Sequence, residues 1–141
     1  MTLLTILLGG MFLPPVSAMG KEIPDLEKFQ GEWIIYSIES LGRKIDGTKA
    51  TTLSIKGHAW LMTIRGKETK KTFTINASES PPHFDLSTSV KDGTQLVHKG
   101  LYKFDGDSLT VCVPLYANGV RPTELEGGEG VEVFVFKRPV K

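Results

Sequence analysis

Short segments in which apolar and polar residues alternate follow one another along most of this 141-residue chain. The segments are rich in β-branched and aromatic residues, and the intervals between them carry the glycine, proline, asparagine and aspartate typical of turns. No long stretch has the period of an amphipathic helix. The pattern predicts eight β-strands, at residues 32–40, 53–55, 60–64, 71–75, 84–87, 96–104, 109–113 and 131–138.

Eight strands joined by short turns predict an all-β fold, an antiparallel up-and-down β-barrel. Asp105-Gly106-Asp107 is a tight hairpin signal between two of the strands. Closure into a barrel removes exposed strand edges, and a barrel of this size either holds one small ligand or is filled by side chains. Two longer connections, 41–51 and 114–130, would frame the mouth of the barrel.

One helical turn is expected before the first strand. Leu26 and Phe29 are three residues apart, so a turn over residues 25–29 places both on one side. We expect this turn to act as a plug for one end of the barrel.

The first eighteen residues differ from the rest of the chain. Residues 2–13 are apolar and uncharged, Pro14-Pro15 interrupts any helix, and Val16-Ser17-Ala18 is typical of a cleavage site. We interpret residues 1–18 as a signal peptide and residues 19–141 as the barrel domain. The apolar run is shorter than the roughly 20 residues that a membrane-spanning helix needs. We therefore expect an exported protein, periplasmic or extracellular, with no membrane span after cleavage.

The amino-acid composition and net charge argue against a nucleic-acid partner and against cysteine-based cross-links or zinc sites. Hydrophobic residues make up 40% of the chain, which suits a packed core, and the formal net charge is +1. A nucleic-acid-binding protein normally has a basic excess to neutralise phosphates, so no nucleic-acid partner is expected. Cys112 is the only cysteine, which excludes an internal disulfide and a structural zinc site built on cysteines. We expect Cys112 to be a small core residue.

The first strand has two readings. If Trp33 points inward, strand alternation also turns Ile35, Ser37 and Glu39 inward, and the lumen becomes polar away from Trp33. In the other register Ile34, Tyr36 and Ile38 point inward, and the lumen is apolar. The residues alone leave both registers open.

Few residues suggest reaction chemistry. His98 lies within a strand with Tyr102 on the same face, and a small barrel can hold haem by one histidine. We favour a histidine that either points outward or has its hydrogen bonds already satisfied. No Ser/His/Asp or Cys/His order suggests a hydrolase, so we expect no enzyme activity, no metal and no cofactor. Arg121-Pro122-Thr123-Glu124 is either a recognition lip over the mouth or a loop pinned by an Arg–Glu contact.

Gly31-Glu32-Trp33, placed after a short helical turn, resembles the Gly-x-Trp signature of the lipocalins. In that family the tryptophan closes the base of the barrel and a basic residue of the last strand packs across its ring. The resemblance implies structural roles for Gly31, Trp33 and a basic residue of the last strand, Arg138 or in second place Lys137, and it favours Trp33 inside. Four segments together resemble an uncharacterised lipocalin-like domain family abundant in planctomycete bacteria. They are DLEKFQGEW (25–33), GLYKFDGDSLTVC (100–112), RPTE (121–124) and VFKR (135–138).

The leading functional hypothesis is non-enzymatic binding of a small hydrophobic or amphipathic ligand in the barrel lumen. The expected wall residues are Ile35, Ser37, Leu53, Ile55, Met62, Tyr102 and Val111. The alternative is a filled-barrel interaction or scaffold module without a small ligand, because the strands are short and bulky Trp60, Phe73 and Phe104 could fill the lumen.

Overall fold

The computed structural model describes residues 24–47 and 51–140, so the predicted signal peptide, residues 1–18, lies outside the described residues. The helical turn spans residues 24–29 and starts at Pro24, whose fixed φ suits a first helical position. The described residues also form nine strands. They are β1 (Gly31–Ser40), β2 (Arg43–Asp46), β3 (Thr51–Lys56), β4 (Ala59–Ile64), β5 (Lys67–Asn76), β6 (His83–Ser89), β7 (Gln95–Asp105), β8 (Ser108–Pro114) and β9 (Val131–Lys137).

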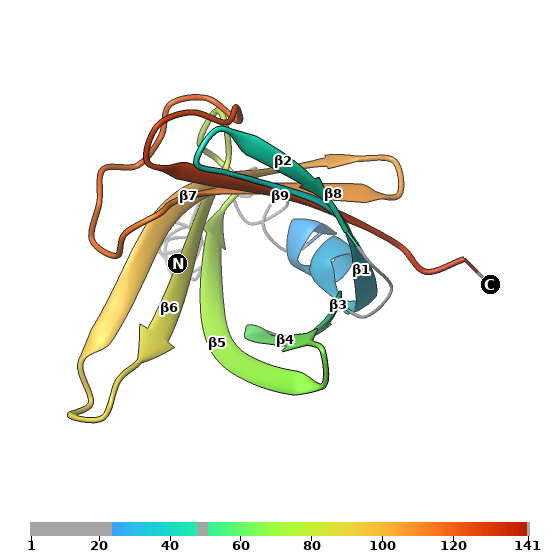
Figure 1. Ribbon diagram of the computed structural model, residues 1–141, viewed down its shortest axis with the longest axis horizontal. Coiled ribbons are helices and arrows are strands. Elements are labelled where there is room, and N and C mark those ends of the chain that lie inside the picture. Colours follow the sequence, from blue (N-terminus) through green and yellow to red (C-terminus); the bar gives the residue numbers. More distant parts are fainter. Residues whose placement is uncertain (1–23, 48–50, 141) are drawn as a thin grey trace, which may run out of the picture.

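Eight of these strands close into an antiparallel barrel, which confirms the predicted fold class (Figure 1). Strands β3 to β9 pair in chain order, each with the next, and β1 pairs with β3 on one side and with β9 on the other. The predicted hairpin at Asp105-Gly106-Asp107 is confirmed, since Asp105 pairs directly with Ser108.

The antiparallel order places successive connections at opposite ends of the barrel. The helical turn and the connections 56–59, 76–83 and 105–108 lie at one end, the base. The connections 64–67, 89–95 and both predicted long connections leave from the other end, the mouth.

Strand β2 is an addition to the predicted eight, because residues 41–51 were expected to be an irregular connection. The chain reverses at Leu41-Gly42, where both residues have positive φ, 53° and 75°, as in a type I′ hairpin turn. Strand β2 then pairs with Ser37–Ser40 of β1, beyond the point where β3 ends its pairing with that strand. Strand β2 therefore lies alongside the mouth end of β1 and is not one of the eight strands of the closed ring.

The connection 114–130 folds back over the outside of the barrel. The Asn118 backbone N–H donates to the Val97 carbonyl at 2.7 Å. Arg121 Nη1 donates to Asp85 Oδ1 at 2.7 Å and to the Gly100 carbonyl at 2.8 Å. Of the two interpretations of the Arg121 segment, the structure shows the pinned loop. The acidic partner of Arg121 is Asp85 of β6, whereas the expected partner was Glu124.

Candidate ligand site in the barrel lumen

Aromatic side chains fill the lumen near the base. Phe29, from the helical turn, is fully buried, and the centroid of its ring lies 4.9 to 6.0 Å from the ring centroids of four surrounding aromatic side chains. They are Phe73, Phe84, Tyr102 and Phe104. Trp60 extends the cluster toward the mouth by contacts with Phe73, Phe84 and Phe136. This half of the barrel is a packed core, as the filled-barrel alternative expected.

Hydrogen bonds hold the helical plug in the base. The Tyr102 hydroxyl donates to Asp25 Oδ2 at 2.6 Å, and Trp33 Nε1 donates to the Phe29 carbonyl at 2.8 Å. Gln30 bonds the Gly57 backbone in both directions, donating to its carbonyl at 3.0 Å and accepting from its N–H at 2.6 Å. The plug is therefore tied to β1, to β7 and to the β3–β4 turn.

Arg138 closes the base from outside by packing on Trp33. Its guanidinium carbon lies 3.7 Å from the centre of the indole ring, and its N–H groups donate to the carbonyls of Glu32 and Lys28. A Cβ at Gly31 would lie only 3.2 Å from Arg138 Nη1, and Gly31 has a φ of +103°. Both the close approach of Arg138 and the positive φ therefore favour glycine at this position. Partial burial lowers the pKa of Arg138 from its ordinary value.

Arg138→Ala should lower the free energy of unfolding by about 2 kcal/mol, because it removes a cation–π contact and two charge-assisted hydrogen bonds. Arg138→Lys should recover less than half of that loss, since an ammonium lacks the planar fork that serves both carbonyls. Urea unfolding followed by circular dichroism measures the loss. Lys137→Ala is the matched control, because Lys137 only covers the exposed ring of Tyr36. Equal losses for Arg138→Ala and Lys137→Ala would contradict the base-closing role.

Four of the expected wall residues belong to this packed core and are absent from the lining of the mouth-end cavity described below. Ile35, Leu53, Ile55 and Tyr102 are each at most 5% exposed and lie in one cluster with the aromatic side chains of the base. Trp33 is also buried and inward, so the start of β1 has the register favoured by the family resemblance. These residues fill the lumen near the base.

Ser37, a fifth expected wall residue, faces away from the lumen because β1 carries a bulge. Ile35 pairs with Phe136 but Ser37 pairs with Val135, so Tyr36 is the extra residue. Opposite residues of an antiparallel pair share a face. Beyond Tyr36 the inward residue is consequently Ile38, and the expectation that alternation would carry Ser37 and Glu39 inward is wrong.

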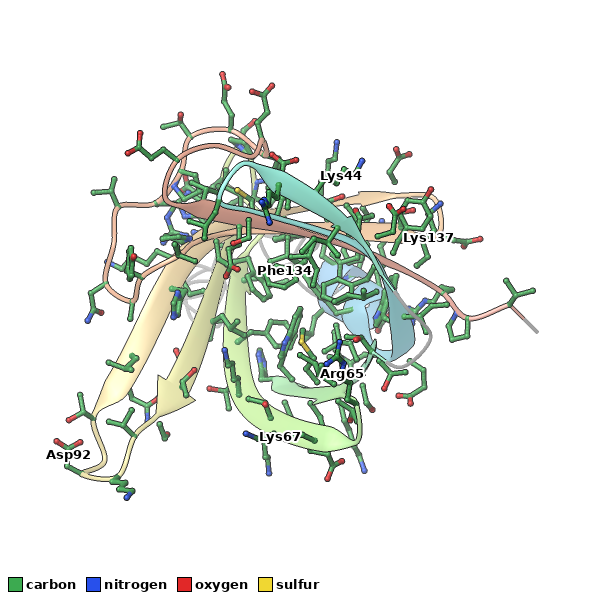
Figure 2. All side chains as sticks on the ribbon, in the orientation of Figure 1. Lys44, Arg65, Lys67, Asp92, Phe134 and Lys137 are labelled. Carbon is green, nitrogen blue, oxygen red and sulfur yellow. The ribbon has the colours of Figure 1, made fainter. Side chains whose placement is uncertain are left out.

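The other half of the lumen, toward the mouth, is hollow. It holds a cavity of about 150 Å³ with a mainly apolar lining. Two of the expected wall residues, Met62 and Val111, line it. Figure 2 shows Phe134 directed from β9 toward the barrel interior, where it forms part of this lining. The complete lining is Trp60, Met62, Ile64, Thr69, Lys71, Leu86, Val111, Val113 and Phe134.

Sequence reasoning missed most of this lining. Alternation along β5 places Thr69 and Lys71 on the lumen face if Phe73 points inward. Alternation along β6 places Leu86 on that face if Phe84 points inward. That signal was available. The depth of each residue along the barrel was not available, because it depends on strand register and tilt.

Two titratable side chains considered in the sequence analysis, those of His98 and Cys112, are engaged in structural contacts. Nδ1 of His98, the haem-ligand candidate, lies 2.9 Å from the Pro114 carbonyl oxygen. The Cys112 thiol is fully buried under the 114–130 connection, and burial, together with the charge of Glu39, raises its pKa to about 11. In the part of the chain that the structure describes, no group of three or more His, Cys, Asp or Glu residues is placed to hold a metal ion.

Comparison with known proteins gives no match: no family model, no curated protein and no solved structure matches the chain. Within residues 24–47 and 51–140, no helix has the length and apolar character needed to cross a bilayer.

Proposed function

We propose that the protein is an exported, non-enzymatic binding domain whose lipocalin-like barrel holds a small apolar group in its lumen. The observation that carries this proposal is the cavity at the mouth end, about 150 Å³ and lined mainly by apolar side chains. An apolar cavity of roughly that volume can hold a molecule the size of benzene. The packed base supplies a rigid floor, since buried Trp60 lies between the cavity and the aromatic cluster.

The cavity bounds the size of the ligand. Drug-sized ligands occupy pockets of roughly 300–1,000 Å³. The lumen therefore suits a single ring or a short alkyl chain, and any larger part of the ligand must extend beyond the barrel. Most of the free energy of binding would come from transfer of this apolar group out of water, at about 25 cal/mol per Å² buried.

Neutral 1-hexanol should bind in the cavity and shift the methyl NMR signal of Met62, the one methionine among the described residues. Thr69→Trp should abolish the shift, because Thr69 lines the cavity and an indole there would occupy it. Thr74→Trp is the matched control, with the same substitution on the exposed outer face of the same strand. If hexanol leaves Met62 unperturbed in the native protein, lumen binding is wrong and the filled-barrel interaction module takes its place.

A further inference from the structure

A polar hollow adjoins the lumen cavity where β5 and β6 separate. The two strands pair from Thr72 and Ser87 to the base, but nearer the mouth β5 pairs only with β4, and β6 only with β7. Figure 1 shows β5 curving toward β4 while β6 runs in another direction. The hollow between them has a volume of about 240 Å³ and is lined by Lys70, Lys71, Thr72, Ser87 and Ser89.

Each side chain that lines the hollow can donate a hydrogen bond, and two carry a positive charge. Two ammonium groups and three hydroxyl groups contribute, and none of the residues in this lining is acidic. Ser89 Oγ already accepts a hydrogen bond from Gln95 Nε2 at 2.6 Å, so its own proton remains available for a ligand. A set of convergent donors with two cations suits an oxyanion such as a carboxylate or a phosphate monoester.

Lys71 connects the hollow with the lumen, because it lines both. On β5 it alternates with buried Phe73, which places it on the lumen face beside the point where β6 turns away. Lysine has a long apolar stem and a charged tip, so it can cover an apolar wall while its ammonium group reaches a polar neighbour. The apolar and cationic surfaces are thereby continuous through the gap between β5 and β6.

We propose that the protein binds a small anionic amphiphile, with a short apolar tail in the lumen cavity and an oxyanion head in the hollow between β5 and β6. This assignment rests on the proposed lumen binding, and it adds the chemistry of the head group and its path through the barrel wall. The tail is limited to about six carbons by the cavity volume. The head group lies outside the lumen, and the ligand passes through the barrel wall at the gap between β5 and β6.

The test compares ligands with the same six-carbon tail and different heads. Hexanoate and hexyl phosphate carry an oxyanion, whereas 1-hexanol is neutral. We expect the better of the two anions to bind the native protein at least about tenfold more tightly than hexanol, the size of one charge-assisted hydrogen bond. The methyl NMR signal of Met62 reports occupancy of the lumen by all three ligands. The comparison of hexanoate with hexyl phosphate identifies which oxyanion the hollow prefers.

Three variants locate the head group. Lys71→Met keeps the apolar stem and removes the ammonium, so the preference for the anion should fall to less than about threefold while hexanol still binds. Lys70→Met should lower the preference in part. Lys67→Met is the matched control, because Lys67 is exposed on the same strand (Figure 2) but lines neither the cavity nor the hollow. It should leave the preference unchanged.

Two results would overturn the head-group assignment while leaving lumen binding intact. One is equal affinity of the native protein for hexanol and for both anions. The other is an equal loss of preference in Lys71→Met and Lys67→Met, which would mean that the general positive charge of the hairpin, and no defined site, attracts the anion. Failure of hexanol to perturb Met62 would instead remove the lumen-binding proposal on which the head-group assignment rests.

Discussion

Phe29→Ala should cost about 3–5 kcal/mol of the free energy of unfolding, the range for truncating a fully buried aromatic side chain. The ring is completely buried and contacts four other aromatic rings in the base. Because it projects from the helical turn, its loss would leave a cavity and also weaken the attachment of the plug. Urea unfolding followed by circular dichroism gives the loss directly. It would be a large share of the roughly 5–15 kcal/mol that holds a typical domain folded.

Phe134→Ala is the matched control for this prediction. It removes the same side chain from the cavity at the mouth, where Phe134 is only half-buried and already borders empty space. Its loss should be about 1–2 kcal/mol, since there is less burial to lose. Equal losses at the two positions would show that the base is no better packed than the mouth.

Gly100→Ala should destabilise the barrel by about 3 kcal/mol, at the upper end of the cost of overpacking. A Cβ at this position would lie only 2.1 Å from the Cys112 carbonyl oxygen and 2.8 Å from Val113 Cγ1. The carbonyl belongs to the backbone of a central strand, so the clash is relieved only if β7 and β8 move apart. That movement would also displace the Gly100 carbonyl, which accepts a hydrogen bond from Arg121.

Gly128→Ala is the control for the glycine substitution. A Cβ there meets nothing within 4 Å, and the residue lacks the positive φ that strains other residues. It should change the free energy of unfolding by less than about 0.5 kcal/mol. A thermal midpoint that falls equally in both variants would show that β7 and β8 are less closely packed at Gly100 than their backbone positions indicate.

The barrel could be predicted from the sequence because most strands carry their own signals. Apolar alternation marks each of the eight barrel strands, and glycines with positive φ mark the turns at Gly57, Gly66 and Gly106. The direct pairing of neighbouring strands then follows from the shortness of the turns. The extra strand β2 was missed because all four of its residues are exposed, so no apolar face distinguishes it. Its turn also uses Leu41 at positive φ, where asparagine or glycine is the usual signal.

The candidate site was predicted less completely than the fold. Alternation correctly marked Met62 and Val111 as lumen residues, but it could not tell a filled level of the barrel from a hollow one. That difference depends on which side chains from opposite walls meet. Phe29 reaches the base from a helical turn, a position that strand periodicity does not describe. The bulge at Tyr36 had no sequence signal either, since it contains no glycine, and it alone turned Ser37 away from the lumen.

Closure of β1 against β9 has a consequence for how the chain folds. Arg138 and its acceptor at Glu32 are 106 residues apart in the sequence, so the contacts that complete the ring are among the most distant in the chain. Proteins dominated by such non-local pairs fold slowly, typically in milliseconds to seconds. During synthesis, β1 keeps an open hydrogen-bonding edge until the last strand has emerged, and such an edge readily pairs with other chains. The unfinished chain is therefore more exposed to aggregation than the completed barrel.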